Sequence, residues 1–133
     1  MRNVVVSAWL LLVAGCATEL PSGNIFIVRG VVTGTVTAAG APVTVVTVIA
    51  TAQYSSGEPP LVITDSTRPD NAGHYLVSLA VQNVPDANAP LDVRFRPDIG
   101  SGLPARDTTG LHVLLTIVKP PPESTHVDMS LSP

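Results

Sequence analysis

Apolar and polar residues alternate with a period of two along most of the chain beyond residue 28. In the stretch 28–38, Val32, Gly34 and Val36 fall on one side, and threonines occupy the positions between them. Successive side chains of a β-strand point to opposite faces, so this alternation predicts a strand with one buried face. Similar patterns predict seven strands, at residues 28–38, 43–53, 61–65, 74–81, 91–96, 111–118 and 127–131.

The same alternation predicts which side of each strand is buried. Val45 and Val46 are adjacent, so the alternation changes phase there, which indicates a β-bulge or burial on both faces. In the last predicted strand, Val127, Met129 and Leu131 alternate with polar neighbours. The expected core residues of the three strands with the clearest pattern are Val46, Val48, Ala50, Tyr75, Val77, Leu79, Leu91, Val93 and Phe95.

Turn residues separate the predicted strands. Segments 39–42 and 70–73 contain the Gly, Pro, Asp and Asn residues typical of tight connections, and Gly40 and Gly73 sit where a turn can require positive φ. No segment has a convincing helical pattern. Seven short strands at fairly even spacing predict an all-β fold of two packed antiparallel sheets, and a closed barrel is the structural alternative.

The order of these turns and strands resembles a known family. The motifs are the Gly-Thr-Val at 34–36, the Gly-Ala-Pro-Val at 40–43 and the stretch 71–77, in which Gly73 precedes Tyr75 by two positions. Across residues 29 to 131 the chain resembles the carboxypeptidase regulatory-like, or prealbumin-like, sandwich family. This resemblance implies a seven-stranded antiparallel Ig-like or prealbumin-like sandwich. We expect Tyr75 to bury its ring while its hydroxyl reaches a backbone group at the sandwich edge.

The first sixteen residues have the organisation of a secretory leader. Arg2 gives a basic start, an apolar stretch runs from Val4 to Val13, and two small residues precede Cys16. An apolar stretch of about ten residues is half of what a membrane-spanning helix needs, so a retained transmembrane anchor is disfavoured. Residues 17–27 lack a strand pattern and are typical of a tether.

The end of this leader resembles the lipobox of bacterial lipoproteins. The matching residues are the Val-Ala-Gly-Cys at 13–16, which follow three leucines. The resemblance implies a signal peptide at 1–15 and acylation of Cys16 by a diacylglycerol and a further fatty acid such as palmitate. The residue pattern then predicts a tether over 16–28 and a sandwich over 29–133. Ala17 implies delivery to the outer membrane. The alternative is that Cys16 merely ends an ordinary signal peptide.

A lone cysteine favours the lipid anchor, because Cys16 has no second cysteine with which to form an intramolecular disulfide. The formal net charge of −3 makes nucleic acid an improbable partner. A phosphate backbone requires clustered cations. Here the basic residues beyond the leader are scattered, at Arg29, Arg68, Arg94, Arg96, Arg106 and Lys119.

No arrangement of reactive residues predicts catalysis, a cofactor or a metal. His74, His112 and His126 do not lie at a ligand spacing, and we expect all three to be exposed. Asp65 and the Asp70-Asn71 pair lack the spacing of a calcium loop, so turn formation explains them better. The loop serines lack a Gly-x-Ser-x-Gly elbow, and the C-terminal signature of the transthyretin-like hydroxyisourate hydrolases is missing.

Two arginines on one outward strand face, Arg94 and Arg96, permit an anion site, although pairing with acids such as Asp92 or Asp128 is the simpler interpretation. Sugar binding would need exposed aromatic rings. Beyond the leader the chain offers only Phe26, Tyr54, Tyr75 and Phe95, of which Tyr75 and Phe95 are expected in the core.

The sequence therefore predicts a non-catalytic envelope lipoprotein. Its sandwich would be a structural or protein-interaction module at the membrane surface, and its expected partners are the membrane, through the lipid anchor, and other envelope proteins. A ligand-binding accessory domain, for glycan or peptide, is the alternative. A hydrolase is a third possibility that rests only on fold analogy.

Overall fold

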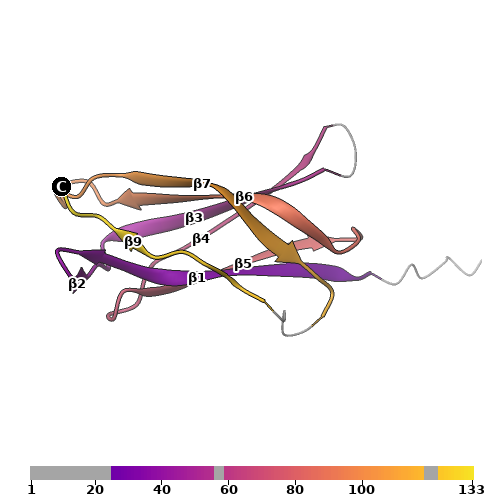
Figure 1. Cartoon of the computed structure of the whole chain (residues 1–133), viewed down its shortest axis with the longest axis horizontal. Coiled ribbons are helices and arrows are strands. Elements are labelled where there is room, and N and C mark those ends of the chain that lie inside the picture. The colour runs from indigo at the N-terminus through magenta and orange to yellow at the C-terminus, as the bar shows by residue number, and fades with distance from the viewer. Residues whose placement is uncertain (1–24, 56–58, 119–122) are drawn as a thin grey trace, which may run out of the picture.

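A computed structural model describes residues 25–55, 59–118 and 123–133 of the chain (Figure 1). Within these residues every regular element is a strand, and there is no helix long and apolar enough to cross a membrane. The strands are β1 (Ile27–Ala38), β2 (Ala41–Pro42), β3 (Val46–Tyr54), β4 (Leu61–Thr67), β5 (His74–Gln82), β6 (Ala87–Pro97), β7 (Arg106–Leu115), β8 (Thr125–His126) and β9 (Met129–Ser130).

The strands form two sheets that pack against each other. One sheet has the order β2-β1-β5, with β8 and β9 also paired to β1, and the other has the order β4-β3-β6-β7. At one edge the sheets are joined, because Arg29 and Thr116 exchange backbone hydrogen bonds of 2.8 and 3.0 Å. The predicted all-β sandwich is therefore confirmed at the level of two packed sheets.

The core lies between the sheets and follows the predicted alternation. In β1 every second residue from Val28 to Val36 is buried, and the threonines between them lie on the outer face. All nine core residues expected in the predicted strands 43–53, 74–81 and 91–96 are buried. Tyr75 and Phe95 meet edge to face across the two sheets, with ring centroids 6.0 Å apart and an interplanar angle of 78°. Tyr54 is also buried, which the sequence did not predict.

The second predicted strand begins later than expected, and the bulge predicted at Val45 and Val46 is wrong. Val43 donates its backbone N–H to the Val36 carbonyl at 3.0 Å, so it continues the turn after β1. Val45 lies outside the strand with an exposed side chain, and β3 starts at Val46. Turn geometry, rather than a bulge, produces the change of phase.

The actual bulge lies between β6 and β7. The pairing register shifts between Leu91 and Val93, opposite a segment that contains Gly110 with φ of 74°. A glycine with positive φ is typical of a bulge. Strand β7 begins at Arg106 and ends at Leu115, instead of covering the predicted residues 111–118.

The last predicted strand, 127–131, contains β9, and both β9 and the preceding β8 run parallel to β1. The prediction of wholly antiparallel sheets is wrong at this position. The residues of β8 and β9 follow β1 in the same direction, with each partner 93 positions further along the chain. Among the described residues there are nine strands instead of the seven predicted, because β2 and β8 are additional.

Candidate functional site

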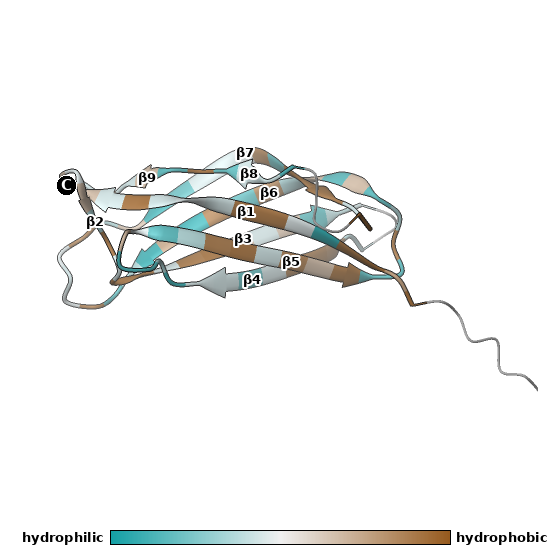
Figure 2. Cartoon of the chain, turned by 90° about the horizontal axis from the view of Figure 1, so that it is seen from below, coloured by the Kyte–Doolittle hydropathy of each residue, from teal (hydrophilic) through white to brown (hydrophobic). Residues whose placement is uncertain are grey.

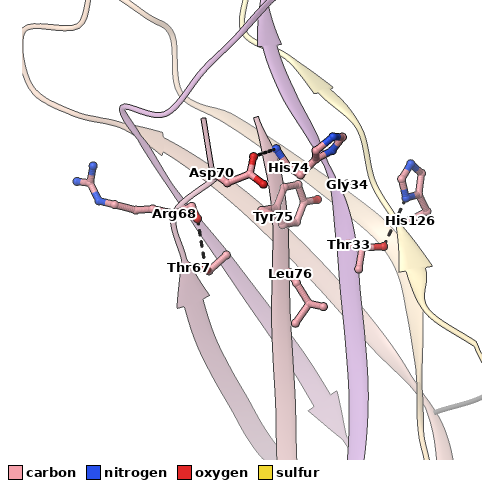
Figure 3. Close-up of a pocket in the computed structure, with 9 residues that line it drawn as sticks. All are labelled: Thr33, Gly34, Thr67, Arg68, Asp70, His74, Tyr75, Leu76 and His126. Carbon is pink, nitrogen blue, oxygen red and sulfur yellow. Dashed lines mark hydrogen bonds between the residues drawn. The ribbon is translucent and has the colours of Figure 1, made fainter. Parts of the chain in front are cut away.

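A groove of about 540 Å³ lies on the outer face of the sheet formed by β5, β1 and β8 (Figure 3). It occupies the half of the molecule remote from residue 25, because Thr35 near the end of β1 pairs with His74 at the start of β5. The groove is lined by Thr33, Gly34, Thr67, Arg68, Asp70, His74, Tyr75, Leu76 and His126.

One wall of the groove is the seam between β1 and the C-terminal segment. Asp128 Oδ1 accepts hydrogen bonds from the backbone N–H of Thr35 at 2.8 Å and from its hydroxyl at 2.7 Å. The His126 Nε2 atom lies 3.0 Å from the same carboxylate oxygen. The Thr35 hydroxyl, then its N–H and the neighbouring His126 lower the pKa of Asp128, so the carboxylate is ionised at neutral pH.

At the floor of the groove, side-chain contacts replace one hydrogen bond of the parallel ladder between β1 and the C-terminal segment. Val127 donates its N–H to the Thr33 carbonyl at 2.8 Å, as in a regular ladder. The next rung would join the Thr35 N–H to the Val127 carbonyl. Instead that N–H binds Asp128, and the Val127 carbonyl accepts the Tyr75 hydroxyl at 2.5 Å. The predicted role of Tyr75 is thereby confirmed, and burial raises the pKa of its hydroxyl.

Gly34 is required at this crossing because the Val127 backbone lies directly over it. A Cβ atom at position 34 would overlap the Val127 carbonyl oxygen. The three residues Gly34, Tyr75 and Asp128 therefore form one unit, which we call the seam lock. It holds the C-terminal segment against β1 and places His126 beside Thr33 in the groove.

The opposite wall is the connection between β4 and β5. Asp70 Oδ1 accepts the N–H groups of Ala72 and His74, each at 2.9 Å, and Gly73 has φ of 78°. The prediction that Asp70 serves a turn is confirmed. The Arg68 guanidinium points away from the two histidines in Figure 3 and forms two hydrogen bonds with Asp98, at 3.0 and 2.7 Å. These contacts fix the rim of the groove.

At the edge of the groove a hydroxyl, an imidazole and a carboxylate lie together, an arrangement that the sequence pattern does not predict. The Thr33 hydroxyl lies 3.5 Å from His126 Nδ1, and His126 Nε2 faces Asp128. Both His126 and Asp128 are more than half exposed, and the Asp128 oxygen is already occupied by Thr35. The hydrogen bonds to Thr35 are therefore sufficient to explain why an aspartate stands at position 128. Asp128 and Thr35 are 93 residues apart in the sequence, so no local pattern predicts their contact.

The three histidines are exposed, as predicted, and two of them, His74 and His126, line the groove. His112 lies on β7 of the other sheet. Among residues 25–55, 59–118 and 123–133, no three His, Cys, Asp or Glu side chains gather as a metal site would require. The polar lining can nevertheless donate and accept hydrogen bonds beside the exposed Leu76.

The predicted pairing of a β6 arginine with an acid is confirmed for Arg96, but the acid is neither Asp92 nor Asp128. Arg96 pairs with Asp107 on the neighbouring strand β7, and this contact lowers the pKa of Asp107. Asp92 and Asp128 do not form this pair, because Arg96 lies on the far sheet from Asp128 and the β6–β7 register places Asp107 opposite Arg94. Both members are exposed, so the pair contributes little to stability.

No family model, curated protein or solved structure matches this chain. The resemblance to the carboxypeptidase regulatory-like family therefore stays a prediction. The signal peptide over 1–15 and Cys16 lie outside the described residues, and lipidation of Cys16 likewise stays a prediction.

Proposed function

We propose that this chain is an exported lipoprotein of the bacterial cell envelope, anchored through Cys16 and delivered to the outer membrane. Its sandwich is a non-catalytic module that binds another envelope protein through the groove on β5, β1 and β8. One observation carries this proposal: the groove lies in the half of the sandwich remote from residue 25, where the tether enters. An anchored domain would thus present the groove away from the membrane.

The build of the groove supports recognition rather than chemistry. Its walls are fixed by backbone contacts of Asp70 and Asp128, so the surface is organised before a partner binds. Leu76 is 56% exposed between polar side chains, which provides an apolar contact point within a hydrogen-bonding rim. The carboxypeptidase regulatory-like resemblance, which rests on turns and core positions, supports the same non-catalytic role.

Metabolic labelling tests the anchor. Cells that express the full chain with a C-terminal affinity tag are fed a clickable palmitate analogue. The wild-type chain should incorporate the label and sediment with membranes, and Cys16→Ser should do neither. A labelled Cys16→Ser band would contradict the anchor.

Photo-crosslinking tests the groove. A benzophenone amino acid replaces Leu76 in the groove or, as a control, Val45, which is exposed at the same remote end but does not line the groove. A discrete crosslinked species from position 76 that is absent from position 45 supports partner binding in the groove. Equal crosslinking from both positions, or none from position 76, would refute it.

A peptide or glycan ligand is the second candidate, favoured by the volume and polar lining of the groove. A peptide suits it better than a sugar, because Tyr54, Tyr75 and Phe95 are buried and cannot stack on a pyranose face. Binding on a glycan array would reverse this preference, and loss of that signal in Leu76→Asp would place the sugar in the groove.

A further inference from the structure

The exposed apolar side chains of the described residues are distributed unevenly. Nine large hydrophobic residues are exposed, and three of them, Val45, Leu76 and Ile99, belong to the remote half. The other six lie at the end where the chain enters β1, and each exposes between 38% and 69% of its surface. They are Ile25, Phe26, Leu61, Val62, Ile117 and Val118.

Three chain segments bring these six residues to one end. The Phe26 carbonyl accepts the Asn83 N–H at 2.9 Å, next to the end of β5. The pairing of Arg29 with Thr116 places Ile117 and Val118 beside the start of β1. Leu61 pairs with Tyr54, whose hydroxyl reaches the Pro85 carbonyl at the same end. In Figure 2 the ends of β1 and β5 beside the grey trace are brown. We call these six residues the apolar end.

The ion pairs among the described residues lie at the other end. Arg68 with Asp98, and Arg96 with Asp107, surround the remote ends of β4, β6 and β7. At the apolar end, the Asp86 carboxylate accepts hydrogen bonds from the Thr116 hydroxyl and the Ile117 N–H, at 2.7 and 2.9 Å. Both oxygens of the Asp86 carboxylate therefore accept hydrogen bonds from within the chain. Among the described residues, exposed apolar side chains gather at one end and ion pairs at the other.

The length of the preceding segment keeps the apolar end close to any lipid held by Cys16. Nine residue steps separate Cys16 from Ile25, and at about 3.5 Å each they reach at most roughly 30 Å. That reach is comparable with the length of β1 itself, which at about 3.3 Å per residue is roughly 40 Å. Among possible occupants of the apolar end, the bilayer surface is thus the one that the anchor itself brings within reach.

We propose that the apolar end docks into the interfacial layer of the bilayer, so that the sandwich stands on the membrane with the groove facing outward. The proposal rests on the lipid anchor proposed above. Transfer of exposed Ile, Val, Leu and Phe side chains from water to the boundary between headgroups and acyl chains lowers the free energy. Docking would convert a loosely tethered domain into one with a fixed orientation.

Tryptophan fluorescence can test this orientation, because the only tryptophan, Trp9, lies within the predicted leader. Residues 16–133 contain every described residue, and Cys16 is the single cysteine. This chain can be coupled through Cys16 to a maleimide lipid in phosphatidylcholine vesicles whose acyl chains carry bromine quenchers. The coupling makes the test independent of whether cells lipidate Cys16, which the labelling experiment addresses separately.

Ile117→Trp and Ile25→Trp report from the apolar end, and Ile99→Trp is the matched control from the remote end. On brominated vesicles both apolar-end reporters should lose about half of their fluorescence relative to unbrominated vesicles, with little change for Ile99→Trp. Two apolar-end reporters guard against one substitution that disturbs the fold.

Equal quenching of all three reporters, or quenching of none, would overturn the proposal, because a tethered but undocked domain exposes both ends alike. A blue shift of Ile117→Trp that grows with protein concentration in the absence of vesicles would also overturn it, since the apolar end would then be an interface between copies of the chain.

Discussion

Strand β1 pairs in different ways on its two sides. Toward β5 the pairing is antiparallel and regular from Ile27–Gln82 to Thr35–His74. Toward β8 and β9 it is parallel, is formed by residues 93 positions away, and is interrupted at Gly34 and Thr35. On the first side backbone groups suffice, and on the second side the seam lock of Gly34, Tyr75 and Asp128 completes the pairing.

This difference shows where specificity resides in the sandwich. The β1–β5 ladder needs only alternation, so many residues could replace its outward side chains. The seam depends on the absence of one side chain, the hydroxyl of a second and the carboxylate of a third. Because the seam also forms a wall of the groove, the residues that decide the site are those that decide the C-terminal pairing.

The largest effect is expected for Gly34→Ala. The new Cβ would displace the Val127 backbone and break the contacts on both sides of it, at a cost of about 3 kcal/mol in the free energy of unfolding. Urea denaturation of residues 16–133 measures this loss. Gly30→Ala is the comparison, because the nearest atoms there are side-chain methyl groups of Val113 and Leu115. An equal loss at both glycines would show that the seam carries no special constraint.

Tyr75→Phe should cost about 2 kcal/mol, because it removes the hydroxyl that satisfies the Val127 carbonyl in a buried position. Tyr54→Phe provides the control, since its hydroxyl bond to the Pro85 carbonyl is longer, at 3.3 Å, and only partly buried. The ratio of the two losses can be read from the same urea series. If Tyr54→Phe costs as much as Tyr75→Phe, the contact of the Tyr75 hydroxyl with the Val127 carbonyl has no special weight in stability.

Asp128→Asn should cost about 1 kcal/mol at neutral pH, since its hydrogen bonds to Thr35 are exposed and partly replaced by water. The sign of the pH dependence follows from the lowered pKa of Asp128. A carboxylate whose pKa falls on folding stabilises the protein fully above its unfolded pKa of about 4, and that stabilisation is lost as the pH falls through the folded value.

Stability of wild type and Asp128→Asn should therefore differ most above the unfolded pKa and converge as the pH falls below the lowered pKa of the folded state. Thermal unfolding monitored by circular dichroism across this range gives the comparison. A gap that stays constant down to the lowest pH would mean that the ionised carboxylate is not what holds Thr35.

The smallest effect is expected on the regular side of β1. Ser78 lies opposite Val31 in the antiparallel ladder and on the outer face. Ser78→Ala should change the free energy of unfolding by less than about 0.5 kcal/mol. A loss as large as that of Asp128→Asn would remove the contrast between the two sides.

The alternation in the amino-acid sequence was enough to assign the buried face of the second, fourth and fifth predicted strands. Alternation placed Val48, Tyr75 and Phe95 in the core, because a period of two assigns each residue to a face whatever the neighbouring strand is. The Asp70 turn was also predictable, since its hydrogen bonds reach only residues 72 and 74. Such local patterns need no knowledge of the rest of the chain.

Tertiary structure decided which strands are neighbours and in which direction they run. The period of two is the same for parallel and antiparallel pairing, so nothing in 127–131 shows that this segment follows β1. The contact of Asp128 with Thr35, the Val127 carbonyl above Gly34 and the pairing of Arg96 with Asp107 all depend on that arrangement. The groove forms because residues far apart in the sequence lie together on one sheet face, and local sequence patterns do not predict such contacts.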